Sequence, residues 1–475
     1  MEGFGVIGNE LLLPKFPPLT GCTSHPIMGN ELLLSEILTR VPVKPLMRFK
    51  CVCKQWYSLI HTDRSFIDLH FTRSKACNFA AGDGSVSLFR CWYQLRVFSS
   101  AELLLSQGGV KTVEREISIP GSCLAHVFGA VNGLISVVEP STCSIRVFNP
   151  STGQSTPWIK SMIKQLNENP QEEILVIDKD GDYATHKVTY GRGPWDYFGY
   201  DPAAKEHKVI TIWTKRVSNW RGFSPCGTVC EVMTVDGRQR NNNLLWRRLD
   251  DELSLPPTIS PLYFSSSLYA NGCIYWLSRA TPDKEPLVVE FNVGSEKFRV
   301  ISIPNYIIEE IRYPYYSRLI QIGGRLAVLA LKIRWDAEFP SINNNTSMKM
   351  CVLYDDGDDV QHKKLTDISN ATTSISSADT VSNFYWIEET FIVPPFECKL
   401  RISNSILAVP DTDLFIIKSE EGDDLSFYFY DWRKKSFSKD AQFILKDQKS
   451  HFREPLPFGA FIYKESLLPV PTREV

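Results

Sequence analysis

The stretch ELLLSEILTRVPVKPLMRFKCVCKQWYSLI, residues 31–60, carries the clearest helical pattern of the chain. Its apolar residues recur at steps of three and four, which places them on one face of a helix. They form a first series and a second series: Leu34, Ile37, Leu38 and Val41, then Leu46, Phe49, Val52, Cys53, Trp56, Leu59 and Ile60. Pro42 separates the two series, because proline has no backbone N–H to continue a helix.

The second series contains signals for where its helices begin and end. Pro45 fits a first helical turn, where its missing N–H would have had no partner anyway. A break near residues 51–54 would divide this series in two. Asp63 or Ser65 can cap a last short turn that includes Phe66 and Leu69. We therefore predict a small helical domain over residues 28–75.

Residues 1–27 show no sustained periodicity, and we predict a flexible leader there. The string GNELLL occurs twice, at residues 8–13 and 29–34. The first copy runs into Pro14, Pro17 and Pro18, which stop helix growth. Only the second copy continues as a helix.

From residue 76 to residue 475 the sequence pattern changes to short runs of residues that favour β-strands. The runs are rich in Val, Ile and aromatic residues and are separated by Gly, Asn, Asp and Pro, which is typical of strands and tight turns. Examples are SVSLFRCWY, GLISVV, SIRVFNP, HKVITIW, CIYWLS, LVVEFNV, RLAVLALKI and FYFYDW. So long a β region must close on itself or repeat, because open sheets leave unpaired edges.

Two short phrases recur in this β region. In the first, a Gly turn leads into a strand, and Asn-Gly or Gly-Gly supplies the positive φ that tight hairpins need. It occurs at Asn132-Gly133, Asn271-Gly272 and Gly323-Gly324. In the second, an aromatic residue precedes Asn or Asp, whose side chain can bond to the turn backbone. It occurs at Phe148-Asn149, Tyr200-Asp201, Phe291-Asn292, Tyr354-Asp355 and Tyr430-Asp431.

The spacing of these phrases favours a sheet unit that is used several times. It is irregular but compatible with propeller blades of roughly 40 to 50 residues. We therefore expect a mainly β protein with a small N-terminal α domain, whose β part is a propeller-like domain of several antiparallel four-stranded units. A pair of large β-sandwiches is the alternative.

Composition excludes several classes of protein. The 475 residues include 52 Lys and Arg against 54 Asp and Glu, a net charge of −2 that argues against a nucleic-acid binder. No window reaches the roughly 18 apolar residues of a membrane span. The 12 cysteines are few and scattered, and no secretory signal is visible. We expect reduced thiols and a protein of the cytoplasm or nucleus, without membrane or nucleic-acid partners.

No catalytic or metal-binding motif is recognisable. The stretch DKDGD at residues 178–182 lacks the glycine position and the twelfth-position Glu of a calcium loop. The cysteines and histidines have no zinc spacing, and neither a nucleophile elbow nor a phosphate loop is present. We therefore expect no catalytic residue, no metal and no cofactor.

Residues 28–75 resemble an F-box of the plant type. The match consists of Glu31-Leu32-Leu33, Glu36-Ile37-Leu38, Arg40-Val41-Pro42-Val43-Lys44, Leu46, Arg48 to Lys54, Trp56, Leu59-Ile60, Phe66-Ile67 and His70. The family's Leu-Pro before the first helix is replaced here by Met28-Gly29, so affinity for the family's partner is expected to be modestly lower. The resemblance implies a three-helix F-box.

The β region is similar to the plant F-box-associated domain, a kelch-like propeller. The similar phrases are NGLISV, FNPSTG, FGYDP with HKVI, NGCIYWL, EFNVGSEKFR and YKESLL. Together the two resemblances imply the substrate-recognition subunit of a Skp–cullin–F-box (SCF) ubiquitin ligase, which is not itself an enzyme. Its F-box docks on a Skp-family adaptor, and through it on cullin and RING subunits, while its β domain binds a target protein for ubiquitination. The alternatives are an F-box protein with a non-degradative role and a propeller enzyme or sugar-binding protein.

The resemblance also suggests which residues make these contacts. The expected adaptor-binding residues are Leu34, Ile37, Val41, Pro42, Val43, Leu46, Phe49, Val52 and Trp56, each of which could instead pack within the helical domain. Residues 28–75 hold eight Lys and Arg against four acids, which favours fast association with an acidic partner. The expected target-binding residues lie in aromatic-rich turns of the β domain, where blade packing is the alternative: Trp195, Tyr197, Trp220 and Tyr315.

Overall fold

The computed structural model describes the helical region, most strands and many of the tight turns. The described residues are 31–76, 85–91, 97–104, 109–111, 117–118, 126–164, 173–177, 183–190, 195–219, 222–235, 246–249, 260–261, 267–279, 286–303, 317–332, 347–355, 372–373, 383–392, 406–409, 414–421, 424–431, 433–434, 436–437, 443–446, 459–463 and 465–471. The chain forms two compact units, Met1–His70 and Phe71–Val475. The predicted leader, residues 1–27, lies outside the described residues.

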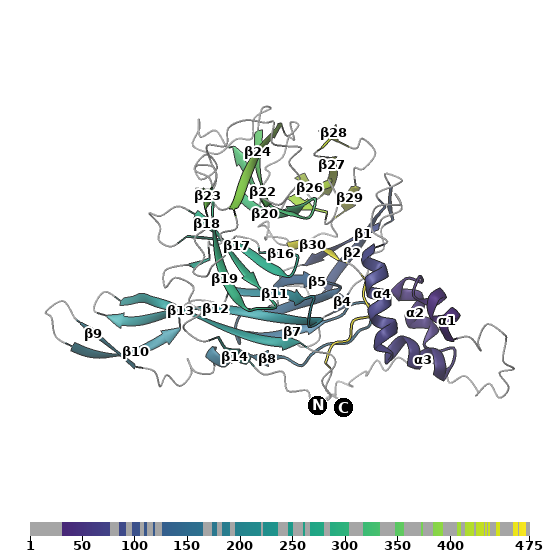
Figure 1. Cartoon of the computed structure of the whole chain (residues 1–475), viewed down its shortest axis with the longest axis horizontal. Coiled ribbons are helices and arrows are strands. Elements are labelled where there is room, and N and C mark those ends of the chain that lie inside the picture. The colour runs from purple at the N-terminus through teal and green to yellow at the C-terminus, as the bar shows by residue number, and fades with distance from the viewer. Residues whose placement is uncertain are drawn as a thin grey trace, which may run out of the picture. The chain divides into compact units, whose positions relative to one another are not determined.

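The helical region contains four helices (Figure 1), one more than predicted. They are α1 (Glu31–Leu38), α2 (Val43–Phe49), α3 (Lys54–His61) and α4 (Arg64–Ala76). The second apolar series is divided by a turn at residues 50–53, as its pattern indicated. The last element is longer than the predicted short turn: α4 has 13 residues.

Two details explain where these helices begin. Pro42 is the residue before α2, with an extended backbone at φ −56° and ψ 154°. The Asp63 carboxylate accepts a hydrogen bond of 3.0 Å from the backbone N–H of Phe66, in the manner of an N-cap. The predicted helix stop at Pro42 and the predicted cap at Asp63 are both confirmed.

The second unit is built of antiparallel strands, which the described residues arrange in six sheets (Figure 1). The first sheet has β1 (Ser85–Cys91), β2 (Val97–Leu104), β3 (Gly109–Lys111), β4 (Ile117–Ser118) and β30 (Gly459–Tyr463). The second has β5 (His126–Val131), β6 (Leu134–Glu139), β7 (Ser144–Phe148) and β8 (Ile159–Lys160). The third has β9 (Glu173–Ile177), β10 (Tyr183–Tyr190), β11 (Trp195–Asp201), β12 (Glu206–Asn219), β13 (Gly222–Val235) and β14 (Trp246–Arg248).

The remaining three sheets follow in chain order. The fourth has β15 (Ser260–Pro261), β16 (Leu268–Ala270), β17 (Cys273–Arg279), β18 (Pro286–Asn292) and β19 (Lys297–Ser302). The fifth has β20 (Ser317–Ile322), β21 (Arg325–Lys332), β22 (Ser347–Asp355), β23 (Thr372–Thr373) and β24 (Asn383–Ile392). The sixth has β25 (Ile406–Ala408), β26 (Leu414–Glu421), β27 (Asp424–Asp431), β28 (Ser436–Phe437) and β29 (Phe443–Lys446).

The six sheets contact one another in a closed cycle, as the blades of a propeller do. The contacts run from β5 to β11, β11 to β17, β17 to β20, β20 to β25, β25 to β30 and β30 back to β5. The cycle closes because β30, the last strand, pairs with β1, the first strand. The fold is therefore the predicted propeller rather than a pair of sandwiches. Its sheets hold four to six strands, because short strands extend the expected four-stranded unit.

The two recurrent phrases are the turns of these sheets. Asn132 and Gly133 have φ values of 52° and 82° in the β5–β6 hairpin, and Asn271-Gly272 and Gly323-Gly324 form equivalent turns with positive φ. In the second phrase the side-chain oxygen accepts bonds from the backbone that follows. Asn149 does so from Ser151 N at 2.8 Å. Asp201, Asn292 and Asp431 make corresponding bonds. The prediction of both turn types is confirmed at these positions.

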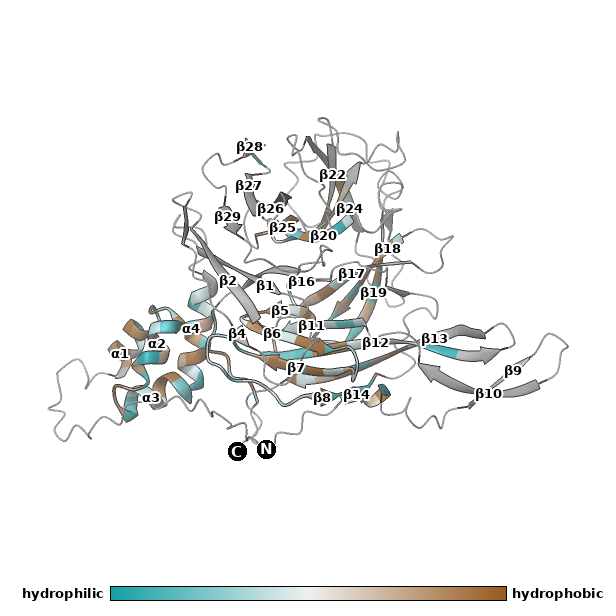
Figure 2. Cartoon of the chain, turned by 180° about the vertical axis from the view of Figure 1, so that it is seen from behind, coloured by the Kyte–Doolittle hydropathy of each residue, from teal (hydrophilic) through white to brown (hydrophobic). Residues whose placement is uncertain are grey.

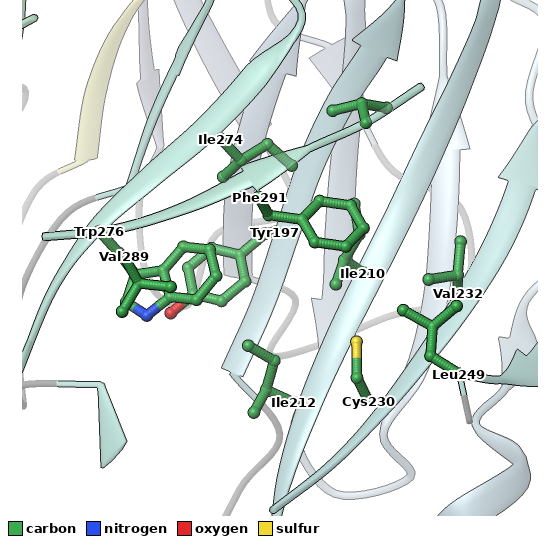
Figure 3. Packing of buried hydrophobic residues seen from close by; sticks show 11 residues of the cluster. Tyr197, Ile210, Ile212, Cys230, Val232, Leu249, Ile274, Trp276, Val289 and Phe291 are labelled. Atoms are coloured by element: carbon green, nitrogen blue, oxygen red, sulfur yellow. The ribbon is translucent and has the colours of Figure 1, made fainter. Parts of the chain in front are cut away.

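Hydrophobic side chains fill the spaces between neighbouring sheets. Figure 2 shows the hydrophobic colour along β6, whose residues are buried except for the last one. Between the third and fourth sheets, Tyr197 stacks on Trp276 with ring centroids 4.5 Å apart (Figure 3). The cluster around this pair is made of Ile210, Ile212, Cys230, Val232, Leu249, Ile274, Val289, Phe291 and Val293. Each sheet thus buries its faces against its neighbours, as the units of a repeat protein do.

Candidate protein-docking surface of the helical unit

The helical unit has a small core of its own. Its buried apolar side chains come from all four helices: Leu34, Leu38, Val43, Leu46, Ile60, Phe66 and Ile67. One long-range polar contact supports this core, since a ring nitrogen of His70 lies 2.9 Å from the carbonyl oxygen of Val41. A core of so few residues gives the unit limited stability by itself. A partner that covers its surface would add to that stability.

That surface is unusually apolar. The large hydrophobic side chains that the structure finds exposed all belong to the helical region, in the part of the chain whose side chains are described. They are Leu32, Leu33, Ile37, Val52, Tyr57 and Leu69, which are between 38% and 83% exposed. Large hydrophobic side chains exposed on one small domain make that domain a candidate for protein docking. We call these six residues the exposed apolar set.

The nine residues predicted to bind the adaptor fall into three groups. Leu34, Val43 and Leu46 are buried, so in this chain they pack the core of the helical unit. Ile37, Pro42 and Val52 are exposed, and Val41, Phe49 and Trp56 are partly exposed. The rings of Phe49 and Trp56 meet edge to face, with centroids 5.5 Å apart. Six of the nine predicted residues therefore have surface that a partner could contact. The other three are buried and can only hold the surface residues in place.

Four members of the exposed apolar set were not predicted. Leu32 and Leu33 lie outside the helical stripe of the first series, and Tyr57 and Leu69 lie outside the stripes that follow. The three consecutive leucines of α1 were the available signal. Successive helix residues point about 100° apart, so three in a row cannot all face one core.

A basic group lies beside this surface. The Lys50 Nζ is 3.3 Å from Nδ1 of His61 and 5.6 Å from the centroid of the Tyr57 ring. Burial lowers the pKa of Lys50, while burial and then the Lys50 charge lower the pKa of His61. His61 is therefore neutral at pH 7, and the positive charge of this group resides on Lys50.

The predicted target-binding residues have a different outcome. Tyr197 is only 5% exposed and packs in the cluster of Figure 3, so the expectation that it contacts a target is wrong. Trp195 is partly buried and packs against the same cluster. The segment that holds them was interpreted as a turn, but it forms β11, whose alternate residues face the next sheet. Trp220 and Tyr315 lie outside the described residues.

The third sheet carries a row of polar side chains that includes two carboxylates, the partly buried Asp196 and the completely buried Glu231. Asp196, Thr211 and Glu231 are directly opposite one another on β11, β12 and β13. The Thr211 hydroxyl donates to Asp196 at 2.8 Å, and Trp213 Nε1 donates to Glu231 at 3.1 Å. Burial raises the pKa of Asp196 to about 7 and also raises the pKa of Glu231. The described residues contain no group of side chains that could hold a metal ion.

A second charged contact joins the third and fourth sheets. Lys208 donates to Glu296 at 2.7 Å and to the carbonyl oxygen of Val293 at 2.9 Å. Arg247 also pairs with Glu296. The Lys208 and Glu296 side chains are nearly enclosed, whereas Arg247 is half exposed. Burial alone would raise the pKa of Glu296, but the bonds from Arg247 and Lys208 together outweigh it and lower this pKa. Glu296 is therefore charged at pH 7 and holds the two sheets together.

Comparisons with known proteins bear on both units. Residues 30–68 match the model of the F-box domain, and residues 85–382 match the model of the F-box associated beta propeller domain. Among helices of the described residues, none is long and apolar enough to cross a membrane.

Similar sequences occur in Arabidopsis thaliana. "Putative F-box protein At4g38870" is 27% identical over 62% of this chain and 60% of its own length. "Putative F-box protein At5g62660" is 29% identical over 62% of this chain and 68% of its own length. The match to the first relative thus spans less than two thirds of that protein. A solved structure of a nidogen/laminin complex aligns with 80% of this chain at 12% identity and a TM-score of 0.36.

Proposed function

We propose, from the premise that this chain belongs to the family of F-box proteins with an F-box associated beta propeller domain, that it is a substrate receptor. In this proposal the helical unit docks on a Skp-family adaptor of an SCF ubiquitin ligase. The propeller holds a protein target, and the chain supplies no catalytic residue to the ubiquitin transfer.

The observation that carries the proposal is the exposed apolar set on the helical unit. Leaving such side chains in water costs free energy, roughly 25 cal/mol for each Å² that a partner could cover. Among the described side chains of the propeller there is no large exposed hydrophobic residue, so the two units differ in how much apolar surface they expose. An adaptor that covers Ile37 and Val52 would recover this free energy on binding.

Charge supports the same partner. Residues 28–75 carry eight basic and four acidic residues, a local excess of four positive charges. Lys50, one of these basic residues, lies beside Tyr57 of the exposed apolar set. Such an excess favours encounter with an acidic surface and mainly raises the association rate. We therefore propose that the adaptor surface facing Lys50 is acidic.

The architecture of the propeller is suited to binding the target protein. Its sheets form a closed ring, and buried polar contacts such as Lys208 with Glu296 join neighbouring sheets. In this proposal the propeller binds the target while the helical unit of the same chain binds the adaptor. The gain is proximity, because the lysines of the target meet the ubiquitin-loaded enzyme at a raised effective concentration.

Binding to a purified Skp-family adaptor tests the docking step. The full chain is compared with Ile37→Asp, which puts a charge into the exposed apolar set, and with Ser65→Asp, at an exposed position of α4 outside it. We expect Ile37→Asp to abolish binding and Ser65→Asp to leave it unchanged. If neither the native chain nor the control binds an adaptor, the proposal is wrong.

A second experiment tests the ligase role. Cells that produce the chain without residues 31–70 are expected to accumulate the proteins that the propeller binds, because these are no longer ubiquitinated. If adaptor binding is retained by the full chain but no bound protein changes in lifetime, a non-degradative F-box function replaces the ligase role.

A further inference from the structure

The last described segment, residues 465–471, lies along the propeller without forming a strand. It follows directly on β30, the strand that closes the ring by pairing with β1. Ser466, Leu467, Leu468 and Val470 are buried. We call residues 465–471 the C-terminal strap.

The strap is held by the turn that follows β7 in the second sheet. The Asn149 amide Nδ2 donates to the carbonyl oxygens of both Ser466 and Leu468, each at 2.9 Å. The Ser151 hydroxyl oxygen accepts from the backbone N–H of Ser466 at 3.3 Å. The Gln154 side-chain oxygen accepts from the backbone N–H of Val470, also at 3.3 Å.

All four of these bonds go to the backbone of the strap. Side chains of the turn therefore recognise the strap as an extended peptide, while Leu467, Leu468 and Val470 add buried apolar contact. A peptide-binding site works in the same way, with main-chain hydrogen bonds for affinity and buried side chains for selectivity.

The turn is pre-organised for this role. The Asn149 side-chain oxygen accepts from the backbone N–H groups of Ser151 and Thr152, which fixes the direction of its amide. The backbone of Asn149 also bonds to Gln154 and Gly153. Asn149 is completely buried, so each of its polar atoms is committed either to the turn or to the strap.

We propose that the turn around Asn149 is a peptide-binding site, which the chain occupies with its own C-terminal strap to lock the propeller. The strap starts after β30 in the first sheet and ends on the second sheet, so it ties the sheet in which the ring closes to the sheet that follows it. The C-terminal part of the chain is thus held twice in succession, first by the pairing of β30 with β1 and then by the bonds of the strap to the turn around Asn149. This site is separate from the helical unit, and the inference does not depend on the proposed ligase function.

Cleaving the strap after folding tests the proposal. A specific protease site is inserted after Tyr463 of the full chain, and the folded protein is cut there. We expect the released C-terminal piece to stay bound through size-exclusion chromatography. A labelled synthetic peptide of residues 464–475, KESLLPVPTREV, is then expected to exchange into the cut protein and to be displaced by the unlabelled peptide, whereas a scrambled peptide has no effect.

Two changes identify the contacts that matter. Asn149→Leu removes the amide at similar size, and we expect at least about tenfold weaker peptide binding, because two strap carbonyls lose their donor. Changes in the peptide avoid any effect on folding of the protein. An ester in place of the Val470 amide removes the N–H that Gln154 accepts, and it is also expected to weaken binding.

The proposal is overturned if the cut piece separates while the thermal unfolding of the body stays unchanged. It is equally overturned if the scrambled peptide binds as well as the native peptide, or if neither the Asn149→Leu protein nor the ester peptide binds more weakly.

Discussion

The side chain of Asn149 and the backbone of Ser466 are hydrogen-bonded at 2.9 Å although 317 residues separate them in the chain. Both lie in phrases that the sequence made conspicuous, FNPSTG and YKESLL. In the structure the first phrase forms the turn, and the second overlaps the strap that the turn binds. Two phrases that lie far apart in the β region are thus two halves of one contact.

Shortening Leu46 tests the core of the helical unit. Leu46 is completely buried, so Leu46→Ala is expected to cost about 2 to 5 kcal/mol of the stability of this unit. Hydrogen exchange at the α2 amides in the full chain measures the loss. Leu32→Ala is the control, because Leu32 is 83% exposed and its removal is expected to change the stability by less than about 0.5 kcal/mol. Equal effects of the two changes would contradict the placement of Leu46.

Neutralising Glu296 tests the charged contact between the third and fourth sheets. Glu296→Gln leaves the buried ammonium of Lys208 without a charged partner, and we expect a loss of roughly 3 kcal/mol in denaturant unfolding. Arg247→Gln is the matched control at the same carboxylate. Arg247 is half exposed, so its removal is expected to cost less than about 1 kcal/mol. The account fails here if the control costs as much as Glu296→Gln.

The row of Asp196 and Glu231 predicts how stability depends on pH. The pKa of Asp196 is about 7 in the folded chain, well above the value near 4 of an unfolded Asp. The folded state therefore keeps a proton that the unfolded state has lost, and stability falls as the pH rises from about 4 to about 7. Above that range the contribution of Asp196 is constant.

Asp196→Asn isolates this effect. The amide does not titrate, so the variant should gain stability over the native chain by an amount that grows on the order of 2 kcal/mol between low pH and pH 8. This figure is less than the pKa change alone implies, because Asp196 is only partly buried. Urea unfolding of both proteins at several pH values gives the measurement. A difference that does not vary with pH would show that Asp196 is not protonated in the folded state.

The elements that local chemistry determines could be predicted from the sequence. The helix stop at Pro42, the cap at Asp63 and the Asn-Gly turn at Asn132 all depend on residues close together in the chain. The repetition of the turn phrases also predicted a propeller, because each phrase marks a hairpin of one sheet. The length of α4 was missed, since its last residues carry no apolar period.

The surfaces depend on tertiary packing and were harder to predict. A stripe of apolar residues shows that a helix has a buried face, but not which neighbours cover each side chain. Leu34 and Ile37 therefore looked equivalent, although the first is buried and the second is exposed. Tyr197 was placed on the surface because the aromatic residues around it looked like a turn. The ring of Trp276, which buries it, comes from a different sheet.

The pairing of buried charges was invisible for the same reason. Lys208 and Glu296 are 88 residues apart, and nothing near either residue in the sequence points to the other. Such contacts arise only when the sheets pack against one another. The sequence predicted the sheets, and the packing decided which of their polar residues became structural.

The most direct test of the account is calorimetric titration of the purified full chain with a Skp-family adaptor, alongside hydrogen exchange of the complex. We expect saturable binding, protection of the helical region around Ile37 and Val52, and loss of both in Ile37→Asp while the circular dichroism spectrum stays unchanged. Binding that persists in Ile37→Asp with full protection, or an adaptor that protects only the propeller strands, would contradict the claim that the exposed apolar set is the docking surface.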